Sequence, residues 1–358
     1  MFSFQCLRII RKKSRALLYE KKCNLKRLKL SKNDVEIENI NKKYNHLAQV
    51  VVKTKYSSIN PSDLNLISGT YPMSSKVFPD IGGIGSVGIV EKILKPISNS
   101  RLKIGDSVAY IRCHNCNVGA WQSKILVSES NLIKIPENVS LIDALFCLSG
   151  PITAYLMLHN FIKLQSGDLI IQNGANSQCG IAIIELAKYM GLKSINLIRR
   201  HNAETDKVLV HNLYNHGADH VFHYDEIIEN VSNIKKLVGT PKLAFNCISS
   251  DESTLSLIKM LDENSKFITY GGMSRQTFSI NPSIFIFKNI SLCGFWLTQW
   301  RKDNLSMIDG LFSEMFHLKS SYILSTPKYQ SIDVEYFDNV NTFYQNYHVP
   351  RIYPIFKF

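Results

Sequence analysis

The residues best suited to chemistry in this chain lie around Tyr71. Residues 59–63 and 68–72 form a pair of loops that precede a glycine-rich turn at residues 82–86. A phenol that is held beside an enolate can protonate it, so Tyr71 is a candidate general acid. A catalytic zinc ion would need thiol or imidazole ligands in these loops, and none is available there.

The segment at residues 172–180 has the composition of a phosphate-binding turn. It reads Gln-Asn-Gly-Ala-Asn-Ser-Gln-Cys-Gly and lies between a predicted buried strand and a predicted helix. Small residues allow the backbone to approach a pyrophosphate group, which a helix N-terminus attracts. The full Gly-x-Gly-x-x-Gly pattern is absent, and an ordinary glycine-bearing loop is the alternative.

The next predicted strand ends in three basic residues, Arg199, Arg200 and His201. A site for NAD would place Asp or Glu near this position to bind the ribose hydroxyls. Guanidinium groups match the geometry of phosphate instead, so the sequence favours NADP(H) over NAD(H). A solvated basic strand end is the alternative.

Two later segments follow predicted strands at the edge where α/β sheets bind ligands. Residues 270–273 read Tyr-Gly-Gly-Met, and residues 295–297 read Phe-Trp-Leu. Paired glycines permit the close approach of a ring, and apolar side chains can line a nicotinamide pocket. Core packing explains Phe295 and Trp296 about as well when they are considered alone.

These segments require a scaffold, and the pattern of apolar residues predicts one in two parts. Short apolar or alternating runs at residues 48–56, 87–94, 107–111 and 124–127 indicate a compact, mostly antiparallel β domain. After Pro151, buried strands are predicted at residues 168–172, 194–198, 219–222, 242–248, 266–270 and 291–295. Helical segments such as residues 179–190 separate them, which predicts a parallel, doubly wound sheet.

The predicted fold class is therefore α/β, a Rossmann doubly wound parallel sheet joined to a β-rich domain. We expect a basic head over residues 1–32, the β-rich domain over 33–143 and the dinucleotide-binding domain over 144–297. Residues 298–358 lack the βα rhythm, and we expect them to return to the first domain. The apolar run at residues 141–158 contains Asp143 and a Gly-Pro pair, so it is predicted to be core and not a membrane span.

Charge and cysteine usage narrow the class of protein. Residues 1–32 hold eleven Lys or Arg and one acid, so most of the net charge of +13 lies in this head. The rest is nearly balanced, which argues against a nucleic-acid partner. A basic, acid-poor, amphipathic start is typical of a mitochondrial transit peptide, with a disordered basic tail as the alternative. The dispersed cysteines predict a reduced compartment, and Cys113 and Cys116 lack the second pair that a structural zinc site needs.

The order of these motifs resembles the mitochondrial trans-2-enoyl-CoA (enoyl thioester) reductases, which are zinc-free members of the medium-chain dehydrogenase/reductase superfamily. The resemblance covers about residues 45–303. Its most specific parts are Thr-Tyr-Gly-Gly-Met at residues 269–273 and Gly-Phe-Trp-Leu-Thr-Gln-Trp at residues 294–300. The chain departs from the family at Gly150, in the Gly82–Gly83 turn and at Gln178, where the family has Asn, an Asn-Glu pair and Gly.

The resemblance implies a GroES-like catalytic domain, NADPH as cofactor and Tyr71 as proton donor. It also implies a homodimer joined through the sheet edge near residues 291–295, a mitochondrial matrix location and no membrane. The cofactor residues that it implies are Asn176, Ser177, Gln178, Cys179, Arg199, Arg200, His201, Tyr270, Gly271, Gly272, Met273, Phe295, Trp296, Leu297 and Arg351.

The expected reaction is NADPH-dependent reduction of a 2-enoyl thioester, on coenzyme A or acyl carrier protein, in mitochondrial fatty acid synthesis. A zinc-free NADPH:quinone reductase would share the cofactor half but would need neither Tyr71 nor Trp296. A non-catalytic protein on the same scaffold, which binds NADPH or associates with RNA, is the alternative from another class.

Overall fold

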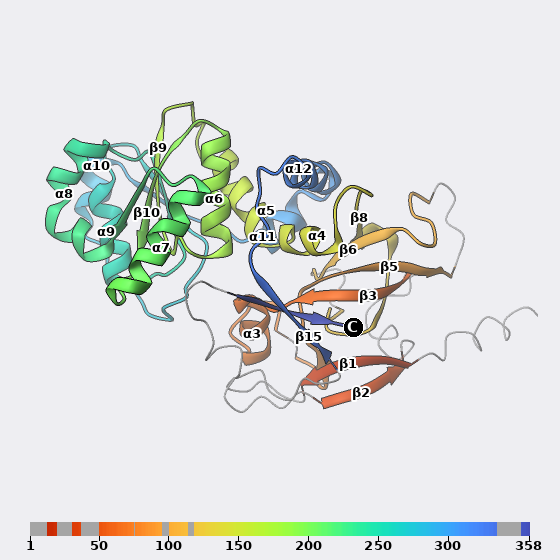
Figure 1. Cartoon of the computed structure of the whole chain (residues 1–358). Coiled ribbons are helices and arrows are strands. Elements are labelled where there is room, and N and C mark those ends of the chain that lie inside the picture. Colours follow the sequence, from red (N-terminus) through yellow and green to blue (C-terminus); the bar gives the residue numbers. More distant parts are fainter. Residues whose placement is uncertain are drawn as a thin grey trace, which may run out of the picture.

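The computed structural model describes residues 13–19, 31–36, 50–74, 76–94, 100–113, 118–334 and 352–358. These residues form a β-rich domain and a Rossmann domain that lie side by side (Figure 1). The helices α4 (Leu141–Cys147), α5 (Gly150–Asn160), α11 (Leu297–Asp303) and α12 (Ile308–Ser320) lie where the two domains meet. One apolar core continues from the first domain into the second, because Val87 and Ile111 belong to the same buried cluster as Ile170 and Phe312.

The β-rich domain contains one large, mainly antiparallel sheet. Its order is β15-β16-β3-β5-β6-β8, and β7 also pairs with β3. The strands are β3 (Val50–Ser58), β5 (Gly85–Ile93), β6 (Ser107–Ile111), β7 (Lys124–Val127), β8 (Leu132–Lys134), β15 (Tyr329–Asp333) and β16 (Tyr353–Lys357). The helix α3 (Pro61–Ser68) follows β3, and a short turn η2 (Glu129–Asn131) precedes β8.

The Rossmann domain contains six parallel strands in the order β11-β10-β9-β12-β13-β14. The strands are β9 (Leu169–Asn173), β10 (Lys193–Ile198), β11 (His220–His223), β12 (Leu243–Asn246), β13 (Lys266–Thr269) and β14 (Ser291–Gly294). Each agrees with a strand predicted from the sequence, and the central strands β9 and β12 are fully buried.

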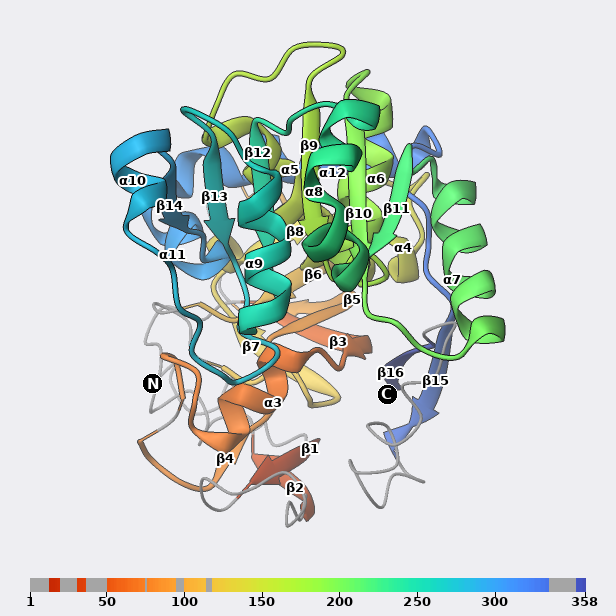
Figure 2. The ribbon, with the colours of Figure 1, turned by 90° about the vertical axis from the view of Figure 1, so that its left-hand side faces the viewer.

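Helices cover both faces of the Rossmann sheet. They are α6 (Gln178–Tyr189), α7 (Ala203–His216), α8 (Tyr224–Val238), α9 (Asp251–Met260) and α10 (Ser283–Lys288). The view along the sheet shows α5 and α6 toward the β-rich domain and α8, α9 and α10 on the far side (Figures 1 and 2). The order of the strands reverses between β9 and β12, and at this point a doubly wound sheet binds its ligand at the carboxyl ends of the strands.

The C-terminal segment returns to the β-rich sheet. After α11, η3 (Leu305–Met307) and α12, β15 and β16 form a parallel pair, and β16 then pairs with β3 through Ile355 and Ser58. Phe356 packs edge-on against Trp121 with 5.1 Å between ring centroids. The end of the chain therefore helps to build the domain that carries Tyr71.

The expectation that residues 1–32 form a head outside the folded body is wrong in part. The strand β1 (Lys13–Tyr19) pairs with β2 (Ser31–Glu36) and with β4 (Asp80–Ile81). Leu17 and Tyr19 are buried, and the Tyr19 hydroxyl donates to Asp80 at 3.0 Å. The positive charges of this region obscured its short apolar run, which the β-rich domain needs to complete its core.

In the part of the chain that the structure describes, no single helix has the length and apolar character to span a membrane. Only α4 and α5 together satisfy such a test, and they are bent by 44° at their junction.

Candidate active site

Tyr71 lies just beyond the end of α3, and local hydrogen bonds fix its backbone. The helix begins at Pro61, whose fixed φ suits the first turn, and it ends at Gly69, which has a left-handed conformation with φ of 83°. The Asn65 carbonyl then accepts hydrogen bonds from the backbone N–H groups of both Thr70 and Tyr71. Tyr71 is half-buried, so its ring is held while its hydroxyl can reach a ligand.

Trp296 of the Rossmann domain meets Tyr71 of the β-rich domain. The Trp296 Nε1–H donates to the Tyr71 hydroxyl at 2.7 Å, and the rings pack edge to face with centroids 5.8 Å apart. An indole N–H can only donate, so the phenol oxygen accepts and its own proton remains available for another acceptor. This is the geometry that a general acid requires.

A second contact joins the two domains beside Tyr71. Arg275 Nη2 lies 3.4 Å from the Asn65 side-chain oxygen, and Arg275 has the unusual φ of 56°. Asn65 therefore uses its backbone to hold Tyr71 and its side chain to reach the loop after β13. No sequence pattern indicated Arg275, because only the fold brings it near α3.

Asp63 anchors α3 to the glycine-rich turn and was not singled out as a functional residue in the sequence. Its two oxygens accept from the backbone N–H groups of Asn60 and Ile84, both at 2.6 Å. Burial raises the pKa of Asp63 to about 7, while these two N–H groups and the charge of Arg112 act in the opposite direction. Asp63 thus joins the start of the helix that ends near Tyr71 to the turn at residues 82–86.

The turn at residues 82–86 accommodates a buried indole. A β-carbon at Gly82 or at Gly83 would lie within 2.4 Å of the Trp121 ring, which is fully buried. The Trp121 Nε1–H donates to the Ser58 carbonyl at 3.1 Å. The paired glycines therefore serve the packing of Trp121, and this requirement is independent of any metal.

The predicted phosphate turn has the geometry of an anion site. Ser177 caps α6, since its hydroxyl accepts from the backbone N–H of Gly180 at 3.0 Å. Gly174 has a left-handed conformation with φ of 61°, so β9 leads directly into the helix. Asn176, Ser177 and Cys179 surround an N-terminus that points to the carboxyl edge of the sheet, where pyrophosphate binds in this fold.

Gly150 and Gln178, two of the departures from the family pattern, lie against each other. A β-carbon at Gly150 would lie 2.9 Å from Cγ of Gln178 and 3.0 Å from the backbone nitrogen of Cys179. The Gln178 side chain passes through this space and donates to the Phe146 carbonyl at 2.8 Å. Gln178 in the phosphate turn therefore occupies the space that a side chain at position 150 of α5 would need.

Two buried asparagines fix the loops around the phosphate turn, and they were not predicted. Asn173 ends β9 and donates to the side-chain oxygen of Asn246 at the end of β12, at 2.7 Å. Asn173 also accepts from the backbone N–H of Cys247 at 2.8 Å. Polar residues at the ends of apolar strands, next to glycine, are the signal that could have identified them.

The residues predicted to wall the nicotinamide occupy the carboxyl ends of β13 and β14. The Tyr270 hydroxyl lies beside the thiols of Cys179 and Cys247, and burial raises the pKa of Tyr270 well above its ordinary value. Burial also raises the pKa of Cys179, so this thiol is not a nucleophile. Gly271 packs against Cys247, whereas Gly272 faces open space and Met273 is exposed.

Phe295 and Trp296 link this edge of the sheet to Tyr71. Phe295 packs edge-on against Phe161 with centroids 6.2 Å apart, and Trp296 precedes α11, whose first residue is Leu297. Of the two alternatives considered for these residues, core packing applies to Phe295 and lining of the site applies to Trp296. Phe295 contacts another aromatic ring of the core, whereas Trp296 bonds to the candidate acid.

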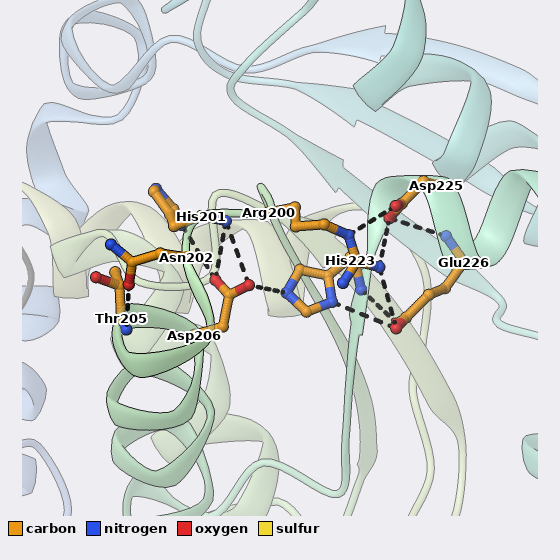
Figure 3. A network of polar contacts seen from close by, with 8 residues as sticks. All are labelled: Arg200, His201, Asn202, Thr205, Asp206, His223, Asp225 and Glu226. Atoms are coloured by element: carbon orange, nitrogen blue, oxygen red, sulfur yellow. Dashed lines mark hydrogen bonds and ion pairs between the residues drawn. The ribbon is translucent and has the colours of Figure 1, made fainter.

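Of the three basic residues predicted to bind the adenosine end, Arg200 and His201 belong to a polar network (Figure 3). Arg200 is paired with Asp225 at 2.8 Å and with Glu226 at 3.3 Å. His201 contacts Asp206, whose other carboxylate oxygen lies 3.1 Å from His223 Nε2. Arg199 is exposed and forms no ion pair with any described residue. The acids around Arg200 were not anticipated, because they lie on another helix about 25 residues farther along.

A cavity of about 200 Å³ adjoins the phosphate turn. Its lining includes Asn176 and Gln178, part of α7, and residues 325–328 of the C-terminal segment. Tyr71 and Trp296 do not line it. This cavity is therefore not the space in which an acyl group would meet Tyr71.

Two sequence expectations fall outside the described residues. Arg351 cannot be placed relative to the phosphate turn, and neither can Cys116 relative to Cys113. Over the described ranges, no three His, Cys, Asp or Glu side chains group in a way that could hold a metal ion.

The residues present fit a dinucleotide. An unpaired guanidinium at Arg199 after β10, the capped N-terminus of α6 after β9 and an open glycine at Gly272 after β13 follow one another along the carboxyl edge of the Rossmann sheet. Their order and chemistry suit the adenosine phosphate, the pyrophosphate and the nicotinamide ring of such a molecule.

Comparisons with known proteins agree with this geometry. Residues 46–137 match the alcohol dehydrogenase GroES-like domain, and residues 179–312 match the zinc-binding dehydrogenase family. The mitochondrial enoyl-[acyl-carrier-protein] reductase of Xenopus tropicalis is 35% identical over 270 residues, which are 75% of this chain and 75% of that protein.

Two solved structures are similar over nearly the whole chain. The mitochondrial 2-enoyl thioester reductase Etr1p/Etr2p heterodimer from Candida tropicalis has a TM-score of 0.81 at 26% identity, covering 97% of this chain and all of that one. The Etr1p complex with NADP and crotonyl-CoA has a TM-score of 0.80 at 25% identity, with the same coverage.

Proposed function

This chain belongs to the family of mitochondrial enoyl-[acyl-carrier-protein] reductases, and from that premise we propose how its residues carry out the reaction. It is an NADPH-dependent reductase of 2-enoyl thioesters, and it acts in mitochondria. The observation that supports the residue roles best is the 2.7 Å hydrogen bond from Trp296 to Tyr71.

NADPH, when bound, supplies the hydride that adds to Cβ of the enoyl group. The negative charge then moves to the thioester oxygen, and Cα needs a proton. Tyr71 donates or relays that proton, because its hydroxyl oxygen accepts from Trp296 and its own proton is directed elsewhere. Trp296 acts as a positioning residue that fixes the phenol.

The cofactor lies along the carboxyl edge of the Rossmann sheet. Its pyrophosphate binds the N-terminus of α6 at residues 176–179, and its 2′-phosphate binds at Arg199. Gly272, Tyr270 and Trp296 would hold the nicotinamide ring. These assignments rest on where the structure places the residues that the sequence predicted.

A test with three acceptors separates this reaction from the alternatives. Oxidation of NADPH is followed with crotonyl-CoA, with a quinone, and with no acceptor. We expect turnover only with crotonyl-CoA. Turnover with the quinone alone would identify a quinone reductase instead, and binding of NADPH without turnover on either acceptor would identify a non-catalytic protein.

The assembly is proposed to be a homodimer joined at β14. This strand is at one edge of the Rossmann sheet, and the free backbone N–H and C=O groups of an edge strand can pair with another strand. Beside it, Ile286 and Phe287 of α10 are 71% and 75% exposed, which is unusual for such apolar side chains in a monomer. Light scattering that gives only the monomer mass of 40.8 kDa at micromolar concentration would refute the dimer.

The mitochondrial leader is proposed to end before Lys13. The chain from Lys13 onward supplies β1, and buried residues of β1 belong to the core of the β-rich domain. The basic residues ahead of it can act as a targeting sequence. A reporter fused to residues 1–12 that remains in the cytosol would contradict this.

A further inference from the structure

Ser249 follows β12 in a backbone conformation that serine rarely adopts. Its φ is 61°, in the left-handed region, where a residue other than glycine is strained. The residue is 4% exposed, so it does not belong to an ordinary surface turn. Strain of this kind persists only where neighbouring contacts hold the residue in place, and it is a reason to look for a function there.

The hydroxyl of Ser249 connects the loops that follow two neighbouring strands, β12 and β13 (Figure 2). It donates to the Gly271 carbonyl at 2.7 Å and accepts from Nδ2 of Asn246 at 3.1 Å. A serine hydroxyl has one proton, so this proton is directed to Gly271. The backbone N–H of Ser249 donates in turn to Oδ1 of Asn246 at 3.1 Å. Ser249 is therefore fixed at the end of β12 and holds the loop that begins after β13.

The rest of the loop after β13 is docked on the same segment by other contacts. The backbone N–H groups of Met273 and Ser274 donate to the carbonyls of Cys247 and Ile248, at 3.0 Å and 2.8 Å. The Ser274 hydroxyl donates to the Ser249 carbonyl at 2.8 Å. Backbone N–H groups thus fix residues 273 and 274, whereas the carbonyl of residue 271 is held by the hydroxyl of Ser249.

The same network reaches the phosphate turn. Oδ1 of Asn246 also accepts from Nδ2 of Asn173 at 2.7 Å, and Asn173 is the last residue of β9, just before Gly174. Both asparagines are fully buried. The chain of hydrogen bonds therefore runs from the phosphate turn through Ser249 to Gly271, and it fixes the position of one loop relative to the other.

We infer that Ser249 is a positioning residue for hydride transfer, because its hydroxyl fixes the loop at Gly271 and Gly272 that would hold the nicotinamide ring. This rests on the proposed function, which assigns the ring to Gly272. Misplacement of a reacting group by about 1 Å can cost about 10²-fold in rate, so a residue that acts through a loop can control turnover. The affinity for NADPH depends mainly on the pyrophosphate and the 2′-phosphate, which the proposed function assigns to the N-terminus of α6 and to Arg199.

The test replaces Ser249 by Ala, which removes the hydroxyl and keeps the β-carbon. We expect kcat with NADPH and crotonyl-CoA to fall about ten- to a hundredfold. The dissociation constant for NADPH, measured by fluorescence titration, should change little. NADPH deuterated at the transferred position should give a primary isotope effect on kcat in the variant, because a misplaced ring makes hydride transfer the step that limits turnover.

Two further variants separate positioning from stability. Ser256→Ala is the matched control, because Ser256 is a buried serine of α9 whose hydroxyl donates to the Ser253 carbonyl at 2.9 Å. It should lower the melting temperature and leave kcat unchanged. Ser249→Gly removes the hydroxyl and relieves the left-handed strain, so it should fold at least as well as Ser249→Ala and still lose kcat. It provides the test if the alanine variant does not fold.

The inference is overturned if the Ser249 variants keep a normal kcat, or if kcat falls without an isotope effect on the variant. Failure of the proposed function would look different. A β-carbon at Gly272 would meet nothing within 4 Å, so Gly272→Val should fold normally and obstruct only a ring that binds there. If Gly272→Val keeps a normal kcat, the nicotinamide ring does not bind at this loop, whatever the Ser249 variants do.

Discussion

Replacing Tyr71 by Phe removes one oxygen atom and keeps the ring. The edge-to-face contact with Trp296, with centroids 5.8 Å apart, should survive the change. The hydrogen bond that Trp296 donates to the hydroxyl at 2.7 Å is lost. The variant therefore separates the acid function of Tyr71 from its packing function.

The two functions differ widely in the size of the expected effect. Loss of one side-chain hydrogen bond should lower the free energy of unfolding by about 0.5 to 1.5 kcal/mol. Loss of a general acid should lower kcat by about 10²- to 10⁴-fold, or about 3 to 5.5 kcal/mol in the activation barrier. The affinity for NADPH should stay almost unchanged, because the proposed cofactor residues lie on the Rossmann domain.

The assay follows the loss of NADPH absorbance with crotonyl-CoA at saturating cofactor. Tyr322→Phe is the matched control, because Tyr322 is 94% exposed and the same atom is removed. Trp296→Phe should reduce kcat less than Tyr71→Phe does, since it releases the phenol without removing it. Near-normal kcat in Tyr71→Phe would exclude Tyr71 from proton transfer, and the hydrogen bond to Trp296 would then be structural only.

Three other predictions follow from contacts described above. Arg199→Gln should weaken NADPH binding by about tenfold, the loss of one charge-assisted pair, and leave NADH binding unchanged in the same titration. Asp63→Asn should lower the free energy of unfolding by about 1 to 3 kcal/mol in urea titration, because its one amide oxygen can accept from only one of the Asn60 and Ile84 N–H groups and its NH₂ group would face the other. The folded chain holds the Asp63 proton up to about pH 7, so the contribution of Asp63 to the wild-type free energy of unfolding should decrease between about pH 4 and pH 7. The Asn variant should lack this decrease. Deletion through residue 20 should lower the melting temperature relative to deletion through residue 12, because Tyr19 and its neighbours are core.

The Rossmann domain could be read from the sequence almost strand by strand. Its central strands β9 and β12 begin with apolar runs because both faces of the sheet are covered there, and such runs have clear ends. The strand β1 was missed for the opposite reason. Its sequence, KSRALLY, begins with two basic residues around a serine, so composition obscured its buried half.

The candidate site likewise contains residues that the sequence indicated and contacts that it could not indicate. The phosphate turn and the adenosine end are local segments, and their residue types indicated their chemistry directly. The contact of Tyr71 with Trp296 joins residues 225 positions apart, so no local pattern could predict it. The carboxylates around Arg200 show the same limit, because a guanidinium in the sequence does not reveal which acids the fold brings to it.

The close packing of Gly150 against Gln178 has a consequence for the history of the chain. A side chain at position 150 would overlap Cγ of Gln178 and press on the backbone of residue 179, so position 178 must shorten before position 150 can grow. The two substitutions are therefore not independent, and reversing them in the other order passes through a strained intermediate. To leave this arrangement without strain, the glutamine at position 178 must therefore change before the glycine at position 150 does.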